Sequence, residues 1–232
     1  MGTLYVVATP IGNLEDISLR AIRLLLTVSV IACEDTRHTG NLIKLLTDRY
    51  AGILNLKFEI SNSRKFISVR DWNEAQVVDQ VLLELQTNDV ALVSDSGTPL
   101  ISDPGFKVVR AARKAGFLVS PIPGPSAAIA ALSIAGLPTD KFVFLGFLGK
   151  KWDLYPGITN IIYESPQRLK KTVDEIYHRY PLAQVVLAKE LTKLHEEVLD
   201  PKLKIENWDL KIGEAVILVN FSPSSPTPAG SP

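Results

Sequence analysis

Short apolar runs of strand length alternate with segments of helical periodicity through the first half of the chain. Val30–Cys33 and Val90–Ser94 have the composition of buried strands, whereas Phe106–Lys114 has helical spacing. Because helices connect strands of this kind, the alternation predicts a parallel sheet covered by helices. The other segments of this half are two expected strands, Leu4–Ala8 and Leu118–Ser120, three expected helices, Ser18–Val28, Asn41–Leu46 and Glu74–Leu85, and one ambiguous run, Leu54–Ile60.

The second half is richer in strands. Prolines surround Gly124 and favour extended backbone before each of them, so the first domain is expected to end near residue 120. The segment Leu191–Gly213 lacks a convincing helix, which favours a mixed sheet. We predict two α/β domains, residues 1–120 and 121–221, and a disordered tail at 222–232. The expected elements of this half are the helices Ser126–Ile134 and Leu169–Tyr177 and the strands Phe142–Phe147, Asn160–Tyr163, Gln184–Lys189 and Glu214–Phe221.

Charge and composition exclude several classes of protein. The 25 basic and 25 acidic side chains cancel, which argues against a protein that coats nucleic acid but allows a local basic patch. Cys33 is the single cysteine, so no internal disulfide can form, and the three histidines lie too far apart for a structural metal site. No apolar stretch reaches the roughly 18 residues of a membrane span. The expected location is the cytoplasm.

Stiff loops rich in glycine and proline follow four of the expected strands, where ligands bind in open α/β sheets. Any one of them could be a simple turn. Ser94–Gly105 is longer than a turn requires, with two prolines, two glycines and two aspartates. Because the chain has no phosphate-binding glycine motif, a ligand such as S-adenosylmethionine (SAM), which has no phosphate, suits this edge. The other three loops are Thr9–Asn13, Pro121–Ala127 and Tyr163–Pro166.

Six consecutive polar residues, Glu34–Thr39, follow the second strand. Asp35 or Thr39 could simply cap a helix. Alternatively, Arg37 could grip a phosphate, and Asp35 or His38 could orient or deprotonate a hydroxyl. The charged run Lys189–Glu197 fits a solvated edge as well as a site. Further basic residues form either a solvated helix face or an RNA-binding rim: Lys150, Lys151, Arg168, Lys170 and Lys171.

The order of these motifs resembles the ribosomal RNA small subunit methyltransferase I family, within the tetrapyrrole methylases. The resemblance implies two α/β domains with SAM in the cleft between them, a homodimer, and 2′-O-methylation of a cytidine in the decoding region of small-subunit ribosomal RNA. It also implies that SAM is bound by Pro10, Ser96, Gly97, Thr98, Ile101, Ser126, Ala127, Glu164 and Ala188. The motifs that carry it are Leu4–Ile17, Glu34–Thr39, Asp95–Gly105, Pro121–Ala127, Leu137–Asp140, Phe144–Phe147, Tyr163–Arg168 and Lys189–Lys193.

Methyl transfer from a sulfonium needs an aligned acceptor oxygen and removal of one proton. Asp35, Arg37 and His38 are the expected residues near the ribose, and Glu74 is a further candidate. Val69–Trp72 and the short segment Gly149–Thr159 depart from the family pattern. Two alternatives therefore stay open: a methylase of a tetrapyrrole or another small substrate, and a SAM-binding interaction module without catalysis.

Overall fold

The computed structural model describes residues 1–55, 63–204 and 215–222. The chain divides into two compact units, Met1–Ser126 (unit 1) and Ala127–Pro232 (unit 2). The predicted tail beyond Ser222 and most of the ambiguous run Leu54–Ile60 lie outside the described residues. The domain boundaries expected from the sequence stay a prediction.

Unit 1 contains a five-stranded sheet in the order β3-β2-β4-β1-β5, and every neighbouring pair in it is parallel. The predicted parallel sheet is therefore confirmed. β5 runs to Ile122, whereas the sequence predicts an end at Ser120, and β3 has no counterpart in the prediction. The strands are β1 (Thr3–Val7), β2 (Val30–Cys33), β3 (Lys65–Ser68), β4 (Val90–Val93) and β5 (Leu118–Ile122).

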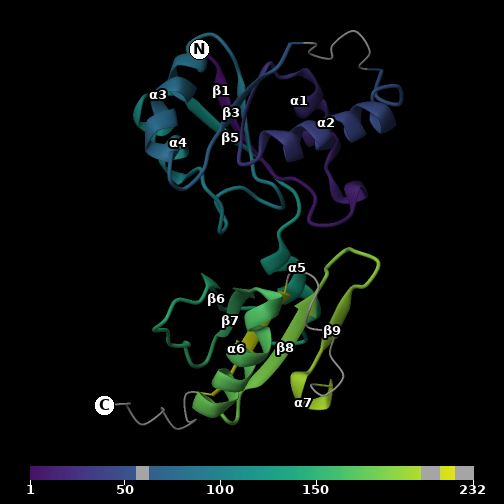
Figure 1. The fold of residues 1–232 in the computed structure, drawn as a ribbon, viewed down its shortest axis with the longest axis vertical. Helices are drawn as coiled ribbons and strands as arrows, with labels where there is room; N and C mark the ends of the chain where they lie inside the picture. Colours follow the sequence, from purple (N-terminus) through teal and green to yellow (C-terminus); the bar gives the residue numbers. More distant parts are fainter. Residues whose placement is uncertain (56–62, 205–214, 223–232) are drawn as a thin grey trace. The chain divides into compact units, whose positions relative to one another are not determined.

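Helices cover both faces of this sheet, α1 and α2 on one side and α3 and α4 on the other (Figure 1). Successive side chains of a strand point to opposite faces, so both faces of β2 are apolar. In α1, Ser18 is the predicted N-cap and accepts a hydrogen bond from the Ala21 backbone N–H at 3.2 Å. The helices are α1 (Leu19–Thr27), α2 (Thr36–Tyr50), α3 (Glu74–Glu84) and α4 (Phe106–Lys114); a short 3₁₀ helix, η1 (Leu14–Asp16), precedes α1.

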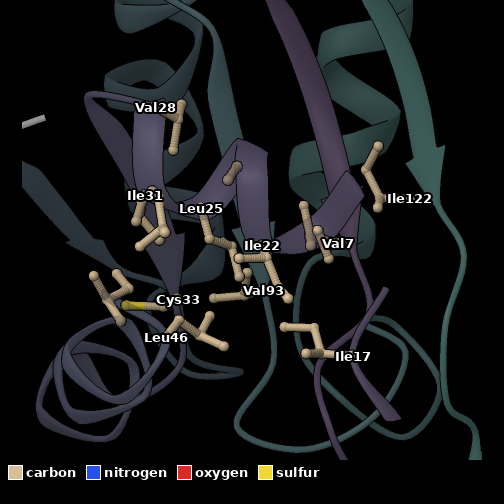
Figure 2. Packing of buried hydrophobic residues seen from close by; sticks show 14 of the residues in the cluster. Val7, Ile17, Ile22, Leu25, Val28, Ile31, Cys33, Leu46, Val93 and Ile122 are labelled. Carbon is tan, nitrogen blue, oxygen red and sulfur yellow. The ribbon is translucent and has the colours of Figure 1, made fainter. Parts of the chain in front are cut away.

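The core beneath α1 and α2 is continuous and apolar. Figure 2 shows Ile22 and Leu25 of α1 beside Ile31, Cys33 and Val93 of the sheet. All five are buried. The strand ends are thereby held in place, and the loops that leave them are positioned by a rigid layer below.

The helix α2 is much longer than the sequence predicts. It begins at Thr36, not Asn41, and continues to Tyr50. Asp35 is its N-cap and accepts hydrogen bonds from the backbone N–H groups of Arg37 at 2.8 Å and His38 at 3.3 Å. The first turn is polar, so its helical structure leaves no apolar periodicity in the sequence. The charged cluster is therefore the start of a helix at the carboxyl end of β2.

Unit 2 contains a five-stranded sheet in the order β6-β7-β10-β8-β9. β6 and β7 are parallel and the other pairs are antiparallel, which confirms the predicted mixed sheet. β9 and one turn of helix, α7, lie in the segment where the sequence shows no convincing helix. The elements are β6 (Phe142–Phe147), β7 (Thr159–Glu164), β8 (Gln184–Lys189), β9 (Glu197–Leu199), β10 (Ala215–Asn220), α5 (Ala127–Ile134), α6 (Pro166–Arg179) and α7 (Pro201–Lys204).

The core of unit 2 forms between α6 and the sheet. Leu169, Val173 and Ile176 recur at helical spacing on α6 and belong to one apolar cluster with Ile162 and Ile217 of the strands. α6 begins directly after β7, so its first turn lies at the carboxyl end of that strand. Among the described residues, no helix is long and apolar enough to cross a membrane.

Candidate functional site

Thr9–Asn13 (the first loop) and Ser94–Gly105 (the second loop) are joined by hydrogen bonds between their backbones. Thr9 and Gly97 exchange two hydrogen bonds, of 2.8 Å and 3.2 Å, and the Thr9 side chain is buried. Ser96 Oγ donates to the Pro10 carbonyl at 3.4 Å. Three of the predicted cofactor residues, Pro10, Ser96 and Gly97, are therefore neighbours.

The third loop, Pro121–Ala127, contacts the second loop. Thr98 Oγ1 donates to the Pro125 carbonyl at 2.8 Å, next to Ser126 in the chain. Gly97 has φ +80°, and a Cβ there would lie 3.2 Å from Ile11 Cγ2, so the contact requires glycine. Loops that approach this closely leave a stiff edge whose backbone groups can meet a ligand.

The remaining predicted cofactor residue of unit 1 is Ile101. Its backbone N–H donates to the Thr98 carbonyl at 3.4 Å, which closes a turn within the second loop. Its side chain is 40% exposed. An exposed aliphatic side chain beside these loops is suited to cover an apolar part of a ligand, such as an adenine ring.

The charged cluster after β2 is connected to the second loop. The Asp35 backbone N–H donates to Asp95 Oδ1 at 3.1 Å. The Asp35 carboxylate also lies 3.8 Å from Arg37 and 3.9 Å from Arg70. Hydrogen bonds from the backbone N–H groups of Arg37 and His38 lower the pKa of Asp35, with smaller contributions from the two arginines. Asp35 is thus an ionised capping group.

Arg37 and His38 differ from Asp35 in their exposure. The Arg37 side chain is 89% exposed, and His38 is exposed as well. Both extend from the first turn of α2, beside the second loop. They are accessible to a large substrate, as the sequence-based expectation of RNA contact requires.

Several carboxylates concentrate negative charge at this edge. The pKa of Asp103 is raised to about 6, chiefly by burial, with smaller contributions from the charges of Glu34, Asp95 and Asp71 and against a hydrogen bond from Ser94. Burial, Asp95 and Asp71 also raise the pKa of Glu34. A site with this potential favours a cationic ligand over a phosphate.

Glu74 is placed differently from the other candidate catalytic residues. It is 6% exposed, and its Oε1 accepts backbone hydrogen bonds from Gly105 at 3.0 Å and Lys107 at 2.5 Å. These N–H groups begin α4, whose N-cap, Gly105, has no side chain to satisfy them. Glu74 therefore caps α4 from a neighbouring helix and fixes the end of the second loop.

Glu164 and Ala188, two of the predicted cofactor residues of unit 2, are buried in its sheet. Glu164, at the end of β7, accepts hydrogen bonds from Thr172 Oγ1 at 2.7 Å and the Ser165 backbone N–H at 2.8 Å. Ala188 of β8 lies opposite Val216 of β10, which in turn lies opposite Tyr163 of β7.

Tyr163 links that group to the start of α5. Its hydroxyl accepts a hydrogen bond from the Ala128 backbone N–H at 3.2 Å, next to the predicted cofactor residue Ala127. Phe144 packs against the Tyr163 ring edge-to-face, with centroids 4.9 Å apart. The structure thus brings Ala127, Ala128 and Tyr163 together within unit 2.

Sequence reasoning does not single out three side chains that the structure makes prominent. Asp95 accepts from the Asp35 backbone, Asp103 carries the raised pKa, and the Tyr163 hydroxyl anchors α5. The aspartates have a signal in the sequence, since two acidic residues in one glycine-rich loop exceed the needs of a turn. The partner of Tyr163 is 35 residues away, which no local pattern reveals.

Comparison with known proteins places the chain among methyltransferases. The sequence profile described as tetrapyrrole (corrin/porphyrin) methylases matches residues 3–205. Proteins named ribosomal RNA small subunit methyltransferase I are 43% identical in Xylella fastidiosa, over 94% of this chain and 81% of that protein, and 46% identical in Escherichia coli O157:H7, over 85% and 68%. The relative of that name in Hydrogenobaculum is 44% identical over 90% of this chain and 89% of its own length.

Solved structures show the same fold. The uroporphyrin-III C-methyltransferase of Thermus thermophilus superposes with a TM-score of 0.65 and 21% identity, over 94% of both chains. A structure of that enzyme from the same organism, complexed with S-adenosyl homocysteine, gives a TM-score of 0.62 and 18% identity, over 94% of this chain and 97% of the other.

Proposed function

The chain belongs to the tetrapyrrole methylase family, and from that premise we propose that it methylates a cytidine ribose of small-subunit ribosomal RNA, using SAM. The acceptor is the 2′-hydroxyl of a cytidine in the decoding region. Relatives named as small-subunit ribosomal RNA methyltransferases align over most of the chain. The observation that carries the proposal is the edge of unit 1, where three stiff loops meet the charged start of α2.

The residues at this edge fit SAM. SAM has a sulfonium and an ammonium group and one carboxylate, so it is a net cation. The carboxylates of Asp95 and Asp103 give the edge the opposite charge. Among the residues proposed to hold SAM are Pro10, Ser96, Gly97, Thr98, Ile101 and Ser126 from unit 1 and Ala127, Glu164 and Ala188 from unit 2.

Bound SAM supplies a methyl group already activated by its sulfonium. The chain must then hold the ribose oxygen in line and accept its proton. Arg37 is exposed at the start of α2 and can pair with a phosphate of the RNA strand. Asp35, with its lowered pKa, stays ionised and serves to orient Arg37 and Arg70 rather than to take up a proton. His38, beside it, is the candidate proton acceptor.

The proposal includes an assembly and a location. We propose a homodimer, as the family resemblance implies, and a cytoplasmic protein, since its substrate is ribosomal. Size measurement in solution by light scattering tests the first of these. A mass equal to one 25.5 kDa chain would contradict it.

A methylase of a small tetrapyrrole is the second candidate, because the solved neighbours act on uroporphyrin. The Glu34–Thr39 cluster and the Tyr163–Arg168 motif favour RNA, since they follow the pattern of the ribosomal branch. A binding module without catalysis is the third candidate. One assay separates all three.

The test is methyl transfer from radiolabelled SAM to small ribosomal subunits that lack the modification, with uroporphyrinogen as the competing acceptor. We expect label in the RNA only. Label in the porphyrin would favour the second candidate, and SAM binding without transfer to either would favour the third. Arg37→Ala should lower transfer about tenfold or more by loss of a phosphate contact. The exposed Arg20→Ala, on α1, is the matched control.

A further inference from the structure

A pocket of about 430 Å³ opens in unit 2, between α6 and the segment that follows β6. Both elements lie at the carboxyl ends of the parallel strands β6 and β7. Ligands in α/β sheets bind at such ends. The side chains that line the pocket and matter here are Lys150, Trp152, Arg168, Lys171, Thr172 and Glu175.

The walls of the pocket are held in place. Arg168, Lys171 and Glu175 recur on one face of α6, above the buried Leu169 and Val173. The Arg168 guanidinium donates to the Leu148 carbonyl at 3.0 Å and lies 3.4 Å from the buried Glu164 carboxylate. This arginine therefore ties the segment after β6 to the end of β7.

The aromatic wall is also fixed. The guanidinium of Arg179 lies 4.3 Å from the centre of the Trp152 ring and donates to the Trp152 carbonyl at 2.6 Å. Arg179 is itself paired with Asp153. Trp152 is half-buried and also packs against the apolar cluster of unit 2, so its ring is a rigid part of the pocket wall, of the kind on which bases stack.

Two basic side chains of the pocket, Lys150 and Lys171, are available to a ligand. Both are exposed, and no carboxylate in the described part of the chain forms an ion pair with either. Lys170, by contrast, pairs with Asp174 at 2.6 Å on the outer face of the same helix. Glu175 is the acidic group of the lining, so the cations outnumber it.

We propose that this pocket binds a nucleotide of single-stranded RNA, with a phosphate between Lys150 and Lys171 and a base against Trp152. Adjacent cations and a rigid aromatic ring are the combination by which proteins hold unpaired nucleotides. The proposal rests on the proposed function and deepens it. It adds a substrate contact on unit 2 to the one proposed for Arg37 in unit 1.

The experiment measures binding of the full chain to fluorescein-labelled oligouridine over a range of salt concentrations. Combining Lys150→Ala with Lys171→Ala should weaken binding about tenfold. The slope of log affinity against log salt should fall by about 0.7, as expected when the one phosphate held between these lysines is no longer neutralised on a single strand. Trp152→Leu should weaken binding with little change in that slope. Lys170→Ala is the matched control and should bind as the parent chain does.

Two results would contradict the proposal that this pocket binds RNA. One is unchanged affinity and slope in the double variant; another is polyglutamate competing as well as unlabelled RNA, which would assign the pocket to an acidic polypeptide. Calorimetric SAM binding and thermal melting check that the double variant is folded. Failure of the proposed function would give a different result. If the parent chain transfers no methyl group but the double variant still loses RNA affinity, the RNA-binding pocket is supported and the proposed methyl transfer is contradicted.

Discussion

Single side chains far apart in the sequence decide how firmly the candidate site is built. Glu74 lies 31 residues before its partner Gly105, yet its carboxylate satisfies the start of α4. A negative charge at that position also interacts favourably with the helix dipole. Sequence reasoning treats Glu74 as a candidate catalytic group, because the pattern around it carries no trace of this distant partner.

Replacing this carboxylate tests its role. Glu74→Ala leaves the Gly105 and Lys107 N–H groups without their acceptor and should cost about 1–3 kcal/mol of unfolding free energy. Urea denaturation followed by circular dichroism measures the loss. Asp79→Ala, exposed on the same helix, should change stability by less than about 0.5 kcal/mol. Full stability with abolished methyl transfer would instead return Glu74 to catalysis.

Asp103 should make stability depend on pH. Its pKa rises from 3.8 to about 6 on folding, so between these values the folded chain binds more protons than the unfolded chain. Stability contributed by this group therefore falls as pH rises through that interval. Asp103→Asn removes the effect. It should melt at a higher temperature than the parent near neutral pH and at the same temperature below about pH 4. An equal difference at every pH would contradict this assignment, and Asp79→Asn is the control.

At the scale of elements, the end of the second loop depends on backbone geometry. Gly105 has φ +130°, and a Cβ there would lie 3.0 Å from Leu92 Cδ2 and 3.2 Å from Leu100 Cδ1. Gly105→Ala should therefore lose about 1–3 kcal/mol of stability and weaken SAM binding. Gly40→Ala, in α2 with no atom within 4 Å of the new Cβ, should gain about 0.5–1 kcal/mol. Chemical denaturation of both variants checks the contrast, and equal effects would refute it.

Elements with a buried apolar face are the ones that the sequence predicts well. β2, α4 and β8 have the predicted bounds, because strand composition or helical periodicity marks them from end to end; β6 also has its predicted bounds, although none of its residues is fully buried. β3 is short, with exposed Lys65 at its start, so no apolar run reveals it. The first turn of α2 is missed for a related reason, since polar residues occupy it and leave no apolar pattern.

The loops of the candidate site can be predicted from the sequence, but their contacts with one another cannot. The loops are recognisable because glycine and proline restrict backbone geometry locally. Their mutual hydrogen bonds, such as Thr9 with Gly97 and Thr98 with Pro125, join positions that only the sheet order brings together. The pairing of Asp35 with Asp95 across neighbouring strands has the same origin.

In the described part of the molecule, apolar clusters cover both faces of the unit 1 sheet and another lies in unit 2, and the single thiol, Cys33, is buried in unit 1. Burial raises the pKa of that thiol to about 11. Alkylation in the folded chain should be about a hundredfold or more slower than in the unfolded chain, because it needs opening of unit 1. Mass spectrometry follows the rate. Leu194→Cys combined with Cys33→Ser, an exposed thiol on unit 2, should react without delay. Equal rates for the two thiols would show that the unit 1 core is open.

The position of β1 in its sheet has a consequence for folding during translation. Leu4 is paired on one side with Val90 and on the other with Val119. Within this sheet β1 is synthesised first and β5 last, so β1 waits for its second partner about six to twenty seconds at ordinary rates of translation. During that interval its apolar residues and free hydrogen-bonding edges are exposed to chaperones and to other nascent chains. The unit 1 sheet is therefore most exposed to aggregation while the chain is still being synthesised.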